Sequence, residues 1–210
     1  MPDTNLRRPR GRPRDKHDGR RDEIVDIAAK LFAARGYHAT SISDLTEATG
    51  LHRGGLYHYI ESKENLLFLI HERFITPLLE EAHAIEARGE PPDVRLRALG
   101  HALMRDIATY HDQVTVFLHE WRSVATATKD AERAQRVREA RRDFEAVIGR
   151  TLRAGVEQGH FKISEPQLAV LGFLGMINYS YQWLKAGHDF DVDTVADAFC
   201  GFFLDGIRAR

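Results

Sequence analysis

The sequence contains a single cysteine, Cys200, among 210 residues. One cysteine excludes an intrachain disulfide framework and a cysteine-cluster metal site, which favours a reducing cytoplasm as the location. The sequence also lacks any run of 18 or more apolar residues, so we expect no membrane-spanning helix. Its first residues are charged and include no apolar segment, which argues against a secretory signal. These absences together predict a globular cytoplasmic protein.

The chain has little net charge, but the charge is unevenly distributed. The 30 Lys and Arg residues nearly balance the 31 Asp and Glu residues, and the formal net charge is −1. Residues 1–21 hold eight basic and three acidic residues, which gives +5 and leaves −6 for the rest of the chain. A basic arm on an acidic body indicates that a polyanion is contacted at one end.

Apolar residues recur at helical spacing along most of the chain, and no convincing strand pattern or fixed-period repeat is present. Residues 1–20 show no such spacing and are rich in Arg, Pro and Gly, so we expect a disordered arm there. The periodicity, caps and glycine stops that follow predict nine helices, at about 22–34, 42–48, 52–59, a long helix from 63, then 94–110, 113–125, 129–158, 166–185 and 193–208.

Two of the short helices meet at Gly50 and form a helix-turn-helix candidate, because glycine tolerates the left-handed backbone that such a turn often needs. Leu45, Ala48, Leu51 and Leu56 are expected to pack the helices together. The outward face of the second helix would then carry His52, Arg53, Gly55, His58 and Tyr59. A helical glycine costs about 1 kcal/mol relative to alanine, so the pair Gly54–Gly55 suggests a close approach to a DNA backbone.

An ordered set of residues within 24–70 carries a resemblance to a known family. The set comprises Ala28–Ala29, Leu31–Phe32, Gly36–Tyr37, Thr40, Ile42, Leu45, Gly50, Gly54, Leu56–Tyr57–His58–Tyr59, Ser62–Lys63–Glu64 and Leu66. It resembles the DNA-binding domain of the tetracycline-repressor (TetR) family of bacterial transcription regulators. Gly55, Thr46 and Ile60 depart from the usual family pattern, and Gly55 removes a hydroxyl that commonly binds phosphate.

The resemblance implies an all-α fold with a three-helix helix-turn-helix domain followed by a six-helix body that binds a ligand and dimerises through its last two helices. We therefore expect a basic arm at 1–20, a DNA-binding domain at 21–64, and a ligand-binding and dimerisation domain at 65–210.

The candidate DNA contacts divide into base readers and phosphate contacts. Arg53 and His52 are interpreted as readers of base edges, since Arg can bridge guanine N7 and O6. Tyr57 and Lys63 are interpreted as phosphate contacts, with helix packing as the alternative for the tyrosine. The remaining candidates are Thr40 and Ser41, which also fit as helix caps, and Gly54, Gly55 and His58.

The segment "RPRGRPR" at 8–14 resembles the core of an AT-hook. Through Arg10 and Arg12 such an arm can enter the narrow minor groove of A·T-rich DNA, and a solvated tail is the alternative.

The body contains candidates for a ligand cavity and for a dimer interface. The cavity candidates, each of which also fits as plain core, are Met104, Phe117, Trp121, Met176, Tyr179 and Trp183. Asn178 lies in an apolar run, and a buried polar group needs a partner, which a ligand can supply. Helix 166–185 is apolar nearly all round, which indicates burial on several sides. With the segment at 199–203, it predicts a homodimer interface of Phe173, Ile177, Tyr181, Phe199, Phe202 and Phe203.

The expected function is that of a transcriptional repressor that binds operator DNA as a dimer and is released by a small hydrophobic effector. Segments 113–121 and 175–187 resemble the subset of the family that senses acyl-CoA thioesters, and other hydrophobic effectors remain open. A ligand-independent DNA-binding protein is the alternative. An enzyme is disfavoured because no nucleophile–base pair or phosphate loop stands out. The eleven histidines form no HExxH motif, so we expect neither a metal site nor a cofactor.

Overall fold

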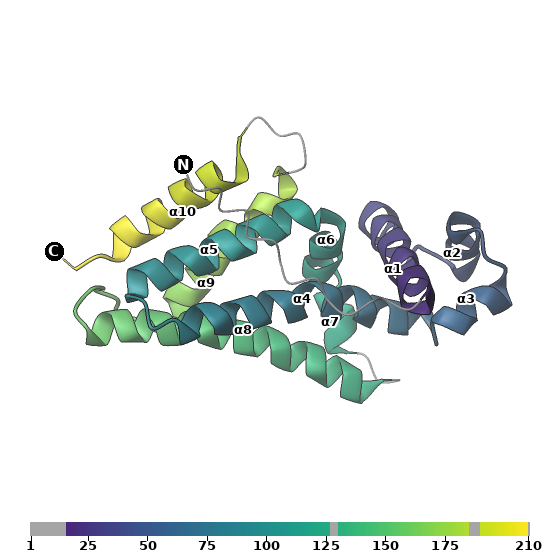
Figure 1. Ribbon diagram of the computed structural model, residues 1–210, viewed down its shortest axis with the longest axis horizontal. Coiled ribbons are helices and arrows are strands. Elements are labelled where there is room, and N and C mark those ends of the chain that lie inside the picture. The colour runs from purple at the N-terminus through teal and green to yellow at the C-terminus, as the bar shows by residue number, and fades with distance from the viewer. Residues whose placement is uncertain (1–15, 127–129, 185–189, 210) are drawn as a thin grey trace.

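A small group of helices at one end and a larger helical body at the other make up the molecule (Figure 1). The computed structural model describes residues 16–126, 130–184 and 190–209. The small group consists of α1 (Lys16–Arg35), α2 (Ile42–Thr49) and α3 (Arg53–Tyr59). Helix α4 (Lys63–Ala87) runs from this group into the body. The body also contains α5 (Pro92–Thr109), α6 (His111–His119), α7 (Trp121–Ala125), α8 (Ala131–Glu157), α9 (Pro166–Asn178), the 3₁₀ turn η1 (Tyr179–Gln182) and α10 (Val192–Ile207).

The predicted all-α class is confirmed, while several helix boundaries differ from the prediction. Within the described residues the only β pairing is an isolated bridge between Phe161 and Arg208. The helix expected at 113–125 is interrupted at Glu120, so α6 and α7 replace one predicted helix. The helix expected at 166–185 ends at Asn178 and continues as η1. None of the helices in the described part combines the length and apolarity that a membrane crossing needs.

Helix α1 begins six residues earlier than expected. The predicted disordered arm covered residues 1–20, but Lys16–Arg20 are helical, and that part of the prediction is wrong. Tertiary contacts explain the extension, because Arg20 donates a hydrogen bond of 2.9 Å to the carbonyl of Thr49 at the end of α2. Arg20 also pairs with Glu23 one turn later at 2.6 Å. The rest of the predicted arm, residues 1–15, lies outside the described residues.

Local sequence signals account for the geometry of α2 and its turn. Ser41 caps α2 in a reciprocal capping box: its hydroxyl accepts from the Asp44 amide at 3.1 Å, and the Asp44 carboxylate accepts from the Ser41 amide at 2.6 Å. The Ser41 hydroxyl also donates to the Asp44 carboxylate at 2.6 Å, and this bond, together with the one from the Ser41 amide, holds the pKa of Asp44 below its ordinary value. Gly50 ends the helix with φ of 66°, the left-handed conformation expected of it. Leu45 and Leu56 are fully buried as predicted, whereas Ala48 is exposed.

Two apolar clusters form the core, and they meet around α6. One fills the body between α4, α5, α8, α9 and α10 and includes Val114 and Phe117 of α6. The other holds α1, α2 and α3 against the first half of α4 and includes Val116 of α6. This second cluster also takes in Val124 of α7 and Val137 of α8. The small group of helices is therefore packed onto the body and does not bury its apolar surface alone.

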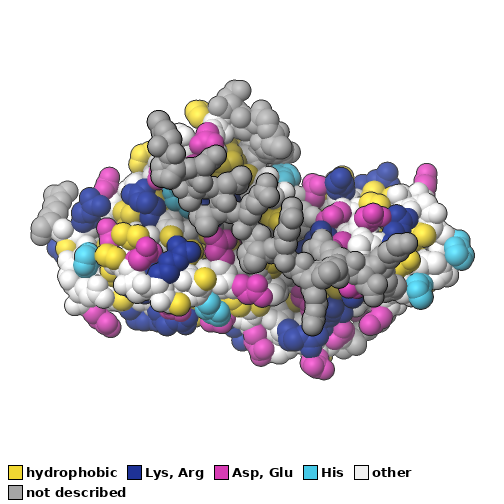
Figure 2. Space-filling view, in the orientation of Figure 1, with side chains coloured by type: hydrophobic (Ala, Val, Ile, Leu, Met, Phe, Trp, Pro, Cys, Tyr) yellow, Lys and Arg dark blue, Asp and Glu magenta, His cyan; other side chains and the backbone are white. Residues whose placement is uncertain are grey.

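Figure 2 shows that basic and acidic side chains are interspersed on the visible face of the body, in keeping with the small net charge. Such a mixed surface produces no long-range field of one sign. On this face, therefore, charge does not mark out a surface for a polyanion.

Gly100 lets α5 approach α10 closely, and this contact generates a stability prediction. A Cβ added there would lie 2.4 Å from Sγ of Cys200 and 3.2 Å from the Phe173 ring. Because neither neighbour can withdraw from the packed core, Gly100→Ala should lower the free energy of unfolding by about 1–3 kcal/mol. Gly19→Ala in α1, where no atom lies within 4 Å of the added Cβ, is the matched control and should be neutral or stabilising by up to about 1 kcal/mol. Urea unfolding at one protein concentration measures both, and equal effects would contradict the packing argument.

Candidate nucleic-acid interface and ligand cavity

The outward face of α3 is accessible and carries most of the residues predicted to contact DNA. His52, Arg53, Gly54 and His58 are exposed, and Tyr57 is 40% exposed. The inward face is closed by Leu56, which is fully buried, and by Ile60 just beyond the helix. The guanidinium of Arg53 lies 5.8 Å from the centroid of the Tyr57 ring. Arginine and tyrosine thus share one side of the exposed surface.

The two candidates before α2 differ in accessibility. Thr40 is buried, and its hydroxyl donates to the carbonyl of Gly36 at 2.9 Å. This hydrogen bond stabilises the turn that follows α1, so in the structure the Thr40 hydroxyl has a structural role and its proton is not directed to solvent. Ser41 is exposed while it caps α2, so its position is compatible with both roles. Arg10 and Arg12 lie outside the described residues.

Lys63 is partly buried at the start of α4, against the ring of Tyr37. Its ammonium lies 4.3 Å from the ring centroid, a cation–π distance. Burial lowers the pKa of Lys63 below its ordinary value. Burial also raises the pKa of Tyr37 to about 12, with Glu64 and Glu120 adding to the effect. Lys63 and Tyr37 both line a groove that lies between the small group of helices and α7.

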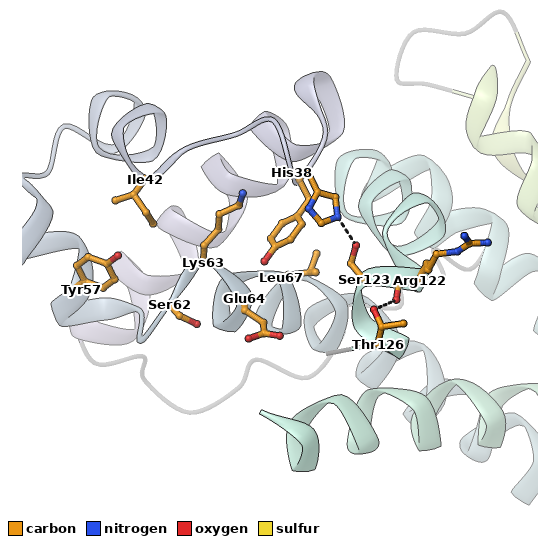
Figure 3. A pocket seen from close by; sticks show the side chains of 11 residues that line it. His38, Ile42, Tyr57, Ser62, Lys63, Glu64, Leu67, Arg122, Ser123 and Thr126 are labelled. Atoms are coloured by element: carbon orange, nitrogen blue, oxygen red, sulfur yellow. Dashed lines mark hydrogen bonds between the residues drawn. The ribbon is translucent and has the colours of Figure 1, made fainter. Parts of the chain in front are cut away.

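A groove of 620 Å³ separates the small group of helices from α7 (Figure 3). Its far wall is formed by Arg122, Ser123 and Thr126, and its near wall includes Ile42, Tyr57 and Lys63. Across the groove, the His38 ring faces Ser123 in Figure 3, with 3.1 Å between Nε2 and Oγ.

A short hydrogen-bond network at the back of this groove joins the α1–α2 loop to the body. Glu120 accepts from the backbone amide of Tyr37 at 3.1 Å and from the Ser123 hydroxyl at 2.9 Å. Since the single Ser123 proton goes to Glu120, His38 must donate from Nε2 to the Ser123 oxygen, which assigns its tautomer. We call Tyr37, His38, Glu120 and Ser123 the interdomain clasp.

Helix α1 is tied to the body at a second place. Gln113 of α6 donates to the carboxylate of Asp26 at 2.9 Å. Arg73 of α4 donates to the Asp22 carbonyl at 2.9 Å and pairs with Asp26 at 3.2 Å. A single helix of the small group is thereby fixed to both α4 and α6.

A cavity of 230 Å³ lies in the body between α4, α5, α6, α8 and α9. Its walls are mostly apolar, with Arg141, Glu145 and Asn178 as the polar members; the apolar lining comprises Phe74, Ile75, Leu78, Leu103, Phe117, Leu118, Phe144, Leu171, Leu174 and Gly175. A concave apolar space with a few polar groups is the usual form of a small-molecule site.

Only part of the predicted ligand set lines this cavity. Phe117 and Asn178 do, and Trp121 lies behind Phe117 with 6.2 Å between ring centroids. Met104 is buried elsewhere and accepts a hydrogen bond from Ser180 at 3.2 Å. Tyr179 is 67% exposed. Of the other two, Trp183 packs against Phe199 and Met176 lies outside the cavity lining.

Arg141 and Glu145 are the charged cavity residues that the sequence pattern did not reveal. The Arg141 guanidinium lies 4.3 Å from the Trp121 ring centroid and pairs with Glu145 one turn later at 3.1 Å. Charged residues are frequent along α8, so in the sequence Arg141 looks like part of a solvated face. Its proximity to Trp121, twenty positions away, was the signal that only the fold could supply.

Two residues of the predicted dimer interface are buried within the protomer, and for them the prediction is wrong. Phe173 and Ile177 are fully buried in the body core, where Phe173 meets Phe203 with 5.1 Å between ring centroids. Tyr181 and Phe199 are partly buried, and only Phe202, at 70%, is widely exposed. The side chains of α9 that face outward are instead Leu168 and Leu171, which are 65% and 54% exposed.

No group of three or more His, Cys, Asp and Glu side chains in the described part of the chain is arranged to hold a metal ion. The expected absence of a cofactor remains a prediction from the sequence.

Comparisons with known proteins agree with this geometry. Residues 24–70 match the family model described as "Bacterial regulatory proteins, tetR family", and residues 89–207 match "Tetracyclin repressor-like, C-terminal domain". The HTH-type transcriptional repressor KstR2 of Rhodococcus jostii is 32% identical over 91% of this chain and 92% of its own.

Two solved structures are also similar. The ketosteroid transcriptional regulator KstR2 of Mycobacterium tuberculosis has a TM-score of 0.84 at 25% identity and covers 91% of this chain and 96% of its own. AibR in complex with isovaleryl coenzyme A and operator DNA has a TM-score of 0.75 at 27% identity, covering 87% and 97%.

His71 of α4 lies beside the cavity residue Phe117, and its burial predicts a pH dependence of stability. It is fully buried, its Nδ1 donates to the Leu67 carbonyl at 2.8 Å, and burial lowers its pKa from 6.5 to about 4. The unfolded chain protonates this imidazole below about pH 6.5, whereas the folded chain does so only near pH 4. The free energy of unfolding is therefore highest above pH 6.5 and falls as the pH drops from 6.5 to about 4.

Relative to His71→Leu, the wild type should lose on the order of 3 kcal/mol of unfolding free energy between pH 6.5 and 4. Urea unfolding across this range measures the difference. Parallel curves for the two proteins would show that His71 does not titrate differently on folding.

Proposed function

The chain belongs to the TetR family of transcriptional regulators, and on that premise we propose that it is a ligand-responsive repressor. In this proposal a homodimer holds operator DNA through the exposed face of α3, and a small hydrophobic effector in the α4–α9 cavity releases it. The observation that carries the proposal is that α6 both lines the cavity, through Phe117 and Leu118, and packs against α1. A ligand can alter DNA binding only if it binds one arrangement of these helices better than another.

The size of the cavity favours a ligand-responsive protein over a ligand-independent DNA-binding protein. A volume of 230 Å³ exceeds the roughly 30 Å³ that one water occupies in the liquid. Its apolar walls offer few partners to trapped water, so an apolar group is the better occupant.

For the effector we propose an acyl-CoA thioester. AibR is bound to isovaleryl coenzyme A in its solved structure, and KstR2 is named a ketosteroid regulator. In this chain the acyl group would lie against Phe117 and Phe144, with the polar part directed to Arg141. Guanidinium groups bind phosphate and carboxylate through paired hydrogen bonds, so an anionic effector would compete with Glu145 for Arg141.

The interdomain clasp offers a direct route from the cavity to the DNA-binding surface. Phe117 and Leu118 line the cavity, and Glu120 of the clasp follows within two residues on the chain. Displacement of α6 by an effector would move Glu120 and hence the loop that precedes α2. The clasp would thus transmit cavity occupancy to the orientation of α3.

The dimer interface of the proposal is the outer face of α9 and α10. The exposed side chains of Leu168 in α9, Tyr179 at the start of η1 and Phe202 in α10 support this choice, because large exposed apolar groups commonly mark an interaction site. A dimer of this kind must present its two α3 helices about 34–36 Å apart, or a multiple, to enter successive major grooves. Operator binding also requires a cytoplasmic location.

Effector-dependent release of DNA is the experiment that tests the proposal, with Arg141 as the variant. The DNA is the best duplex from in vitro selection, and the ligands are isovaleryl-CoA, longer thioesters and the matching free acids. The thioesters should raise the dissociation constant for DNA, measured by fluorescence anisotropy, and the free acids should not. Arg141→Met, which keeps an unbranched apolar side chain but removes the guanidinium, should weaken thioester binding about 10- to 100-fold. The exposed neighbour variant Arg142→Met should bind as the wild type does. Release by free acids alone, or equal effects of the two variants, would contradict the thioester assignment.

Glu120→Ala tests the clasp as the route of transmission. Without the carboxylate, the Tyr37 amide and the Ser123 hydroxyl lose their acceptor, so α6 and the α1–α2 loop move more independently. The variant should bind the effector almost as tightly as the wild type, while the effector-induced loss of DNA affinity shrinks about tenfold, within the usual range of coupling energies. Titrations of both ligands measure this, with the exposed Glu157→Ala as control. Unchanged coupling in Glu120→Ala would show that the signal travels elsewhere.

A further inference from the structure

The ring of His52 lies across the glycine pair at the start of α3. A Cβ added to Gly55 would lie 3.0 Å from both Cε1 and Nδ1 of the ring. A Cβ added to Gly54 would lie 3.7 Å from Nε2 and 3.8 Å from Cδ2, which is ordinary van der Waals contact. The imidazole therefore occupies the space that a side chain at position 55 would need, while position 54 has room for a methyl group.

The contact at position 55 is tighter than ordinary van der Waals contact, so an alanine there would shift the His52 ring. Among the glycines that the structure describes, those with positive φ are Gly36, Gly50, Gly89 and Gly159, so backbone conformation does not require glycine at position 55. A glycine inside a helix also carries a cost in helix propensity. The sequence suggested close approach to a DNA backbone as the reason for the pair, and in the structure Gly55 also leaves room for the His52 ring.

The placement of His52 leaves its imidazole free of a structural task at the helix start. His52 is the N-cap residue of α3, but its side chain makes no capping hydrogen bond. The residue is exposed and directly precedes Arg53, on the face that Leu56 leaves outward. The ring lies beside Gly54 and Gly55, and neither of its nitrogens caps the helix, so an imidazole N–H can donate to a DNA base.

We propose that His52, positioned by the space at Gly55, is a specificity-determining residue that contacts a guanine in the major groove. The inference rests on the proposed function, in which α3 enters that groove. Guanine presents two neighbouring acceptors, N7 and O6, and an imidazole N–H donates to them, whereas cytosine presents an N–H donor at the same edge. In this proposal His52 contacts the base and Gly55 leaves room for the His52 ring, while Arg53 contacts a different base pair.

The test first compares three single variants with the wild type on one set of DNA duplexes. In vitro selection with the full-length wild type defines the preferred duplex, and each single-base-pair variant of it is then titrated. Gly55→Ala displaces the ring and should relax the preference at one base pair per half-site about tenfold, within the range for a lost base contact. His52→Ala should relax the same base pair by a similar factor. Gly54→Ala brings the same gain in helix propensity but leaves the ring in place, so any change in its DNA affinity should be the same for every duplex.

Two further variants distinguish reading from mere support of the helix. The double variant His52→Ala/Gly55→Ala should behave like His52→Ala alone, because the added methyl group has no ring left to displace. His52→Gln should move the preference at that base pair from guanine toward adenine, since a glutamine amide matches the adenine edge. If His52 only stabilised the helix, neither the non-additive effect of the double variant nor the shift from guanine to adenine would be expected.

Several outcomes would overturn the inference. These are an unchanged preference in Gly55→Ala, equal effects of Gly54→Ala and Gly55→Ala, or additive effects in the double variant. A His52→Gln variant that loses affinity equally for all duplexes would assign the ring to phosphate or to stability. If the wild type selects no preferred duplex, the proposed function itself fails, and the inference fails with it.

Discussion

Helix α6 is packed on two sides, and the rest of the structure depends on this arrangement. Val116 belongs to the apolar cluster that holds α1 and α3, while Phe117 belongs to the cluster of the body and lines the ligand cavity. Protein interiors are close-packed, so little empty space is present to absorb a shift of this helix. Any ligand that displaces Phe117 must therefore move either the body around it or the helices that carry the DNA-binding surface.

Polar contacts fix how the small group of helices is positioned against α6. The clasp through Glu120 and the pair Gln113–Asp26 are partly exposed, and contacts of this kind contribute little to global stability. They fix which part of α6 faces which part of α1, and they are easily broken and remade. A regulator needs both properties, since apolar packing keeps the two regions together and the weaker polar contacts allow two arrangements of similar free energy.

Features set by neighbouring residues could be predicted from the sequence, and features set by distant residues could not. The capping box of Ser41 and the left-handed Gly50 follow from local chemistry, and both were expected. The break between α6 and α7 carries no proline or glycine; it occurs at Glu120, which binds Tyr37 from 83 positions away. The burial of Phe173 was missed because a helix that is apolar all round does not indicate which side faces its own core. His52 was predicted to read a base edge, but the closeness of its ring to Gly55 needed the side-chain positions.

The central claim is that the DNA-binding surface and the ligand cavity form one coupled system through α6. Coupling is reciprocal, so DNA must affect the cavity as an effector affects the DNA-binding surface. Hydrogen–deuterium exchange of the full-length protein, with and without its selected duplex, tests this without knowledge of the effector. The account predicts that DNA slows exchange not only in α2 and α3 but also at the backbone amides of α6 and Glu120. Changes confined to α1, α2 and α3, with α6 exchanging at the same rate in both states, would contradict it.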